Sequence, residues 1–102
     1  MKILIVDDEV VVVKILEHAL TSWGHTVKIA RNGREALDIL RAEQIRFVIT
    51  DWVMPEMDGL QLCQAIRAEG FPSYVYTILL TSRGEKEDIV EGLNAGADDF
   101  LI

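Results

Sequence analysis

Short apolar runs alternate with longer amphipathic stretches along the whole sequence, and this alternation limits the folds that the chain can adopt. We expect strands at residues 2–6, 27–30, 46–50, 75–80 and 100–102. Most of these runs are continuously apolar, which is typical of strands that helices cover on both faces. Parallel strands joined through helices are connected by right-handed crossovers. The alternation therefore predicts an α/β fold built on one open parallel sheet.

Four amphipathic stretches between these runs predict four helices. The first spans residues 10–23 and ends at Gly24, and its helical periodicity outweighs a local preference for strand at residues 10–13. We expect Asn32 to cap the second helix, Gly70 to end the third, and Ser82 to cap the fourth. The side chains that we expect on the inner faces of the helices are Val13, Leu16, Leu20, Trp23, Ala36, Leu37, Leu40, Leu62, Ala65, Ile66, Val90, Leu93 and Ala97.

Length and charge place the chain in a broad class. At 102 residues it predicts one domain, residues 1–102, and no apolar run is long enough to cross a bilayer. A net charge of −7, with scattered lysines and arginines, argues against direct nucleic-acid binding by this segment. The single cysteine, Cys63, excludes an internal disulfide. Together with the absence of a visible signal peptide, it favours the cytoplasm.

Acidic or hydroxyl side chains follow three of the predicted strands. Asp7 and Asp8 follow the first strand, Asp51 follows the third, and Thr81 follows the fourth. In an open parallel sheet, ligands bind outside the carboxyl ends of the strands. Carboxylates that lie close together raise one another's pKa values unless a cation is bound among them. Mg²⁺ suits such oxygen ligands and keeps room for a phosphate, so the pattern predicts Mg²⁺-dependent phosphoryl chemistry on an aspartate.

Each of these side chains also has an ordinary structural interpretation. Asp7 and Asp8 could simply cap the following helix, and Thr81 alone is more often a strand-end hydroxyl. Phe100 is by default a core residue of the last strand. Asp51 is harder to explain in this way, because the proline and the Asp-Gly pair that follow it mark a rigid turn. A carboxylate held there beside a metal can attack phosphorus and form an acyl phosphate.

Four sequence blocks carry a resemblance to a known family. They are Ile3-Leu4-Ile5-Val6-Asp7-Asp8-Glu9, Asp51 with Met54-Pro55-Glu56-Met57-Asp58-Gly59, Leu79-Leu80-Thr81-Ser82 and Gly96-Ala97-Asp98-Asp99-Phe100-Leu101. With these blocks in this order, nearly the whole chain resembles a response-regulator receiver domain of two-component signal transduction. The resemblance implies a flavodoxin-like five-stranded sheet of order 2-1-3-4-5 with helices on both faces.

The resemblance also implies roles for the residues at the strand ends. Asp51 would accept a phosphoryl group from a phosphohistidine on a sensor histidine kinase or a histidine phosphotransfer protein. Asp8, Asp51 and the backbone carbonyl of Val53 would bind Mg²⁺ directly, and Asp7 would bind it through water. Thr81 would then donate a hydrogen bond to the phosphoryl group. These roles come from the family and not from spacing alone.

The implied output is a change in partner binding. Phe100 would swing inward behind Thr81, a population shift that requires the phosphoryl group to favour the active arrangement. Such a domain phosphorylates only itself, so we do not expect a conventional enzyme. Two other functions stay open: a receiver-like interaction module that no longer switches, and a Mg²⁺-dependent aspartyl-phosphate phosphatase. The phosphatase usually needs a second aspartate where this chain has Val53. A nucleotide-binding module fits less well, because an acidic segment and not a glycine-rich loop follows the first strand.

The sequence ends at Ile102, before the lysine and the final helix that the family normally has. That lysine would form a charge-assisted hydrogen bond worth roughly 1.5–3 kcal/mol, so we expect weaker phosphorylation and switching without it. We also expect apolar surface at Ile3, Ile5, Val48 and the last strands to be bare, which favours association. Either the chain is a piece of a longer regulator, which we favour, or it dimerises or exchanges elements through this face.

Overall fold

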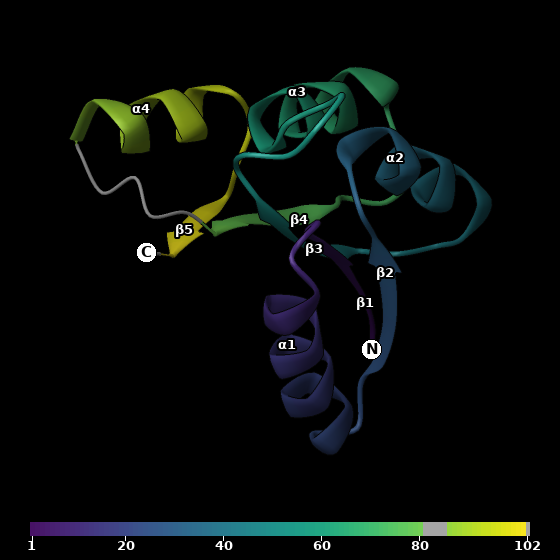
Figure 1. The fold of residues 1–102 in the computed structure, drawn as a ribbon. Coiled ribbons are helices and arrows are strands. Elements are labelled where there is room, and N and C mark those ends of the chain that lie inside the picture. Colours follow the sequence, from purple (N-terminus) through teal and green to yellow (C-terminus); the bar gives the residue numbers. More distant parts are fainter. Residues whose placement is uncertain (81–85, 102) are drawn as a thin grey trace.

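The computed structural model describes residues 1–80 and 86–101 and has the expected α/β architecture (Figure 1). Its strands are β1 (Lys2–Val6), β2 (Thr26–Ala30), β3 (Phe47–Asp51), β4 (Tyr76–Leu80) and β5 (Asp99–Leu101). They pair in parallel in the order β2-β1-β3-β4-β5, which confirms the predicted sheet. The strand ends differ from the sequence-based prediction by about one residue, as is usual for boundaries drawn from pattern alone.

The helices are α1 (Val10–Ser22), α2 (Gly33–Ala42), α3 (Gly59–Glu69) and α4 (Lys86–Asn94). Figure 1 shows α1 on one face of the sheet and α2, α3 and α4 on the other. Asn32 caps α2 as predicted, its side chain accepting a hydrogen bond from the backbone N–H of Glu35 at 2.8 Å. Gly70 ends α3 in the left-handed conformation, with φ 70°. Ser82, the expected cap of α4, lies outside the described residues.

Two groups of buried side chains fill the space between the sheet and the helices α2, α3 and α4. The larger group joins Leu4, Val6 and Val48 of the sheet to side chains of α2 and α3. The smaller group lies toward α4 and consists of Trp52, Cys63, Leu79, Ala95 and Ala97, with Leu60 and Phe100 packed against it. The larger side chains thus fix α2 and α3, whereas the buried side chains next to α4 include the small Ala95 and Ala97 of the loop that follows this helix.

The prediction for the inner faces of α1 and α4 was partly wrong. Val90 and Leu93, expected inside, are 47% and 46% exposed, and Trp23 at the end of α1 is 71% exposed. Gly92 explains the position of α4, because it allows the helix to approach the sheet closely. A Cβ atom there would lie 2.9 Å from Cδ1 of Leu79. A helix that approaches the sheet through a glycine leaves its larger side chains at the margin of the contact.

The expected bare apolar face is smaller than the sequence indicated. Ile3, Ile5 and Val48 are all buried, so the prediction was wrong for these three. Val48 lies in the larger core group, whereas Ile3 and Ile5 alternate with Leu4 and point to the face that carries α1. On the last strands the prediction is confirmed, because Tyr76 and Leu101 are exposed.

Candidate functional site

Three carboxylates meet at the carboxyl edge of the sheet, the edge where the parallel strands end. Asp7 and Asp8 follow β1, and Asp51 is the last residue of the neighbouring strand β3. Carboxylate oxygens of these three residues lie within 4.8 Å of one another. Asp7 is buried, Asp51 is half-buried and Asp8 is exposed, so the group opens to solvent on one side. The gathering of acidic side chains that the sequence predicted is therefore present.

Backbone N–H groups hold two of the three carboxylates in place. Oδ1 of Asp7 accepts a hydrogen bond from the N–H of Glu9 at 2.9 Å. Oδ1 of Asp51 accepts one from the N–H of Trp52 at 2.8 Å. The N–H of Asp7 in turn donates to the carbonyl of Ala30 at the end of β2, at 3.0 Å. The carboxylates are therefore oriented by the strand ends themselves and not by long flexible side chains.

The close approach of these groups changes their acidity. Burial raises the pKa of Asp51 to about 6, and the charges of Asp7 and Asp8 add to the effect, while the N–H of Trp52 opposes it. Burial also raises the pKa of Asp7, with the charge of Asp8 contributing. Negative charge held together in this way favours a bound cation. The donor set consists of carboxylate oxygens, which suits a hard divalent ion such as Mg²⁺.

Two glycines hold the turn that follows Asp51. The N–H of Gly59 donates to the carbonyl of Trp52 at 2.8 Å, and a Cβ atom at Gly59 would lie 2.3 Å from the carbonyl oxygen of Asp51. The N–H of Gly33 donates to the carbonyl of Met57 at 3.1 Å, again with no room for a side chain. Sequence reasoning found the turn at Gly59 but missed Gly33, whose only local signal is its place after the cap of α2.

The other predicted site residues are less closely grouped. The side chain of Val53 is 65% exposed, two residues after Asp51. Phe100 is half-buried and meets the buried ring of Trp52 edge-on, with 6.0 Å between ring centroids. Thr81 lies outside the described residues, so its predicted role stays a prediction. The described structure thus brings together the three aspartates and places Trp52, the residue after Asp51, in contact with Phe100.

The order of these features along the chain is also that of a known family. The response regulator receiver domain matches residues 3–102. The chain belongs to this family. The family acts in two-component signalling. Its members are typically signalling modules that work with a kinase, and not metabolic enzymes.

Individual relatives agree with this receiver domain over almost its whole length. A probable transcriptional regulator ycf27 of Porphyra purpurea is 46% identical over 101 residues, which cover 99% of this chain and 40% of that protein. A chemotaxis protein CheY homolog of Campylobacter jejuni is 38% identical over 104 residues, which cover 100% of this chain and 80% of that protein. This receiver domain therefore spans about two fifths of the length of some relatives and most of the length of others.

Solved structures show the same fold. The chemotaxis response regulator CheY4 of Vibrio cholerae has a TM-score of 0.93 and 31% sequence identity, covering 99% of this chain and 84% of that one. Within the described part of the receiver domain, the helices are too short or too polar to cross a lipid bilayer.

Proposed function

We propose that this receiver domain is a phospho-accepting switch and that Asp51 takes the phosphoryl group. The donor would be a phosphohistidine on a sensor histidine kinase or a histidine phosphotransfer protein. The acidic cluster supports this proposal more than any other feature, because Asp51 lies at a strand end, half-buried, with a pKa raised to about 6. The single cysteine, Cys63, is buried and free, which fits a reducing cytoplasmic setting.

Mg²⁺ is the cofactor that this site would need. Asp8, Asp51 and the backbone carbonyl of Val53 would bind it directly, and Asp7 through water. When bound, the ion offsets the repulsion among the carboxylates and the negative charge of the incoming phosphoryl group. It would also keep Asp51 ionised at neutral pH, because a nearby cation lowers the pKa of a carboxyl group.

The transfer itself uses the oriented carboxylate of Asp51. Oδ1 is engaged by the N–H of Trp52, so we assign the attack on phosphorus to Oδ2. A bond forms between Oδ2 and phosphorus while the phosphorus–nitrogen bond of the phosphohistidine breaks. The imidazole leaves with the electron pair of that bond and takes a proton from solvent water. Thr81 would then bind a phosphoryl oxygen, and Phe100 would move inward.

A surface beside the acidic cluster suits the donor protein. Val10, Val11 and Ile15 of α1 are exposed although they are large and apolar. Val10 and Val11 follow the acidic residues Asp8 and Glu9 directly in sequence, and Ile15 lies one helical turn farther along α1. An exposed apolar patch next to a site of chemistry is typical of a protein–protein contact. We assign this part of α1 to the kinase or the phosphotransfer protein.

Intact mass spectrometry tests the proposal. The chain is incubated with Mg²⁺ and acetyl phosphate, beside Asp51→Ala and a matched control, Asp38→Ala, on the exposed surface of α2. We expect one phosphoryl adduct in the parent chain and in the control, none in Asp51→Ala, and none without Mg²⁺. An adduct that persists in Asp51→Ala would contradict the assignment of the acceptor.

A non-switching interaction module is the alternative, and the exposed apolar side chains of Tyr76 and Leu101 favour it. In that case this face would bind a partner or a second copy of the chain whether or not Asp51 is phosphorylated. Sedimentation velocity with and without acetyl phosphate separates the two proposals, because only the switch predicts a change in association or shape. Turnover of an added phosphate ester would instead revive the Mg²⁺-dependent phosphatase, which lacks its usual second aspartate at Val53.

A further inference from the structure

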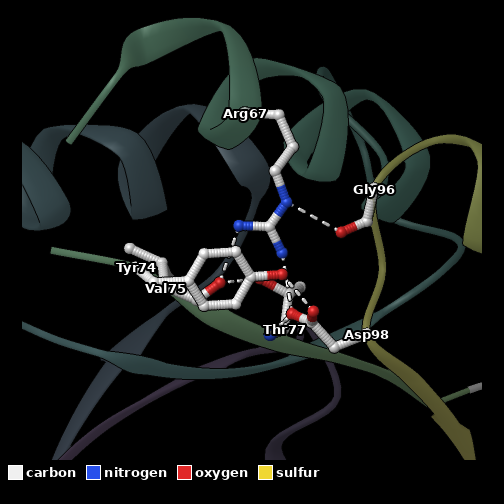
Figure 2. Close-up of polar contacts among 6 residues, drawn as sticks. All are labelled: Arg67, Tyr74, Val75, Thr77, Gly96 and Asp98. Carbon is white, nitrogen blue, oxygen red and sulfur yellow. Dashed lines mark hydrogen bonds and ion pairs between the residues drawn. The ribbon is translucent and has the colours of Figure 1, made fainter.

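A polar cluster joins three segments at the amino edge of the sheet, opposite the aspartates (Figure 2). Arg67, near the end of α3, donates from Nε to the carbonyl of Gly96 at 2.9 Å and from Nη1 to the carbonyl of Val75 at 2.8 Å. Its Nη2 atom pairs with Oδ2 of Asp98 at 2.7 Å. Val75 precedes β4, Gly96 follows α4, and Asp98 precedes β5. One guanidinium group thus connects α3 to both ends of the loop between α4 and β5.

The carboxylate of Asp98 is held from further directions. Its Oδ2 atom accepts a hydrogen bond from the N–H of Thr77 at 2.8 Å, and its Oδ1 atom accepts one from the hydroxyl of Tyr74. The guanidinium of Arg67 lies over the ring of Tyr74, 4.5 Å from the centroid. The backbone N–H of Asp98 donates to the carbonyl of Thr77, at 2.8 Å. We call these six residues, Arg67, Tyr74, Val75, Thr77, Gly96 and Asp98, the Arg67 clamp.

On the other side of this loop, α4 rests on the predicted switch aromatic. A Cβ atom at Gly92 would lie 2.9 Å from Cδ1 of Leu79 and 3.4 Å from Cε2 of Phe100. The backbone of α4 therefore lies directly against the side chains of these two strands. Gly92 is buried, while Val90 and Leu93 on the same helix are about half exposed. A movement of the Phe100 ring toward α4 would therefore displace the helix backbone at Gly92.

We propose that the Arg67 clamp is the fixed point of α4 at Gly96, so that α4 acts as a lever when the ring of Phe100 moves at Gly92. The proposal rests on the proposed function, since it takes phosphorylation of Asp51 as the event that moves Phe100. A helix rises about 1.5 Å per residue, so within α4 the first residue, Lys86, lies about 9 Å beyond Gly92 on the side away from the clamp. A displacement at Gly92 is therefore larger at the start of the helix, because that end lies farther from the clamp.

The clamp decides what such a push achieves. With Gly96 attached to Arg67, a push at Gly92 rotates α4 and changes the position of its exposed apolar side chains, Val90 and Leu93. With Gly96 released, the same push shifts or frays the end of the helix and is lost there. Arg67 is therefore a positioning residue for the exposed surface of α4 that carries Val90 and Leu93. It has this role although it lies at the opposite edge of the sheet from Asp51.

Hydrogen exchange measured by mass spectrometry tests the lever. The chain, Arg67→Met and a control, Arg41→Met, are compared with and without Mg²⁺ and acetyl phosphate, and the Asp51 adduct is quantified in the same samples. Arg41 pairs with Glu69 on the surface, so the control removes the same charge and ion pair without touching the clamp. In the parent chain we expect phosphorylation to alter exchange at residues 88–91 and to leave residues 95–98 protected.

In Arg67→Met we expect residues 95–98 to exchange faster in both states, and the phosphorylation-dependent change at 88–91 to fall at least threefold, with an unchanged yield of adduct. A clamp that only stabilised the fold would speed exchange without reducing that change, and this result would overturn the lever. Tyr74→Phe, which keeps the guanidinium contacts, should give an intermediate effect.

Phe100→Leu provides a test that does not depend on phosphorylation. Loss of the ring beneath Gly92 should speed exchange at residues 88–91 more than at 95–98, and equal changes would contradict the lever. Absence of an adduct in the parent chain would instead count against the proposed function, and Phe100→Leu would still decide whether α4 pivots on the clamp.

Discussion

The carboxylates at the two edges of the sheet have opposite surroundings: at one edge they repel one another, and at the other the carboxylate is paired with a cation. At the carboxyl edge, Asp7, Asp8 and Asp51 lie within 4.8 Å of one another, and their mutual repulsion contributes to the raised pKa of Asp51. At the amino edge, Asp98 is paired with Arg67 at 2.7 Å and accepts further hydrogen bonds. The first arrangement costs stability and favours a bound cation, whereas the second is already satisfied within the chain.

This difference separates the part of the protein that we expect to change on ion binding from the part that we expect to stay fixed. In a site of the proposed kind, the carboxylates repel one another before an ion binds. Relief of this repulsion contributes to the free energy of ion binding. The Arg67 clamp can act as a pivot only if its hydrogen bonds and its ion pair persist with and without phosphorylation. We therefore expect mutations at the amino edge to cost stability, and mutations at the carboxyl edge to remove chemistry while adding stability.

Arg67→Met should have the largest effect on stability. It leaves the carboxylate of Asp98 without its cation in a site where both side chains are mostly buried. Breaking a buried pair in this way costs about 2–4 kcal/mol of the free energy of unfolding. Urea denaturation checks this expectation.

Arg41→Met is the matched comparison for that measurement. Arg41 makes two hydrogen bonds to Glu69, at 2.9 and 3.0 Å, but both lie at the surface. Exposed ion pairs contribute little because water screens them, so the control should lose much less stability than Arg67→Met loses. Equal losses in the two variants would mean that the clamp is no stronger than a surface ion pair.

Asp51→Asn should increase stability in buffer without divalent ions. The substitution removes one of the repelling charges and keeps the size of the side chain, so we expect a gain of roughly 1–3 kcal/mol at neutral pH. Added Mg²⁺ should then stabilise the parent chain and leave the variant almost unchanged. Thermal unfolding in both buffers measures the two effects, with Asp38→Asn on the surface of α2 as the control. A variant less stable than the parent chain would contradict the repulsion argued here.

The stability gain from Asp51→Asn should itself depend on pH. Because the pKa of Asp51 is raised to about 6 in the folded chain, the folded state binds more protons than the unfolded state between about pH 4 and 6. The contribution of this group is therefore fully present at low pH and is lost as the pH rises through its folded pKa. We expect the parent chain and Asp51→Asn to be similar near pH 4 and to diverge toward pH 7. A constant difference across this window, measured by urea denaturation in EDTA, would show that the charge of Asp51 is not responsible.

The carboxyl edge was largely predictable from sequence, because its features are local. A buried strand followed at once by an acidic residue marks a strand end, and parallel strands bring such ends together. Asp7, Asp8 and Asp51 follow from this rule alone. The caps at Asn32 and Gly70 are local for the same reason, since each depends on a few neighbouring residues.

The amino edge could not be predicted in this way. Arg67 and Asp98 are 31 residues apart, and each lies in a sequence where a charged residue would ordinarily face solvent. The prediction of which side chains of α4 are buried failed for a related reason. Periodicity predicted that Val90 and Leu93 face inward, but the helix packs through Gly92, whose role depends on Leu79 and Phe100 in other strands. Long-range contacts between polar or small residues leave no periodic pattern along the chain.

The smallest predicted effect concerns the lifetime of the phosphoryl group. Val53 is exposed two residues after Asp51, the proposed acceptor, and its side chain offers no polar atom to orient an attacking water. We expect Val53→Asn to lose the phosphoryl group several-fold faster, since one well-placed hydrogen bond of about 1 kcal/mol changes a rate by that factor. The decay of the adduct mass after removal of acetyl phosphate measures this rate, with Val53→Ala as the control for simple loss of bulk. If the two variants decay at the same rate, access to the acyl phosphate and not the orientation of water limits its hydrolysis at the carboxyl edge.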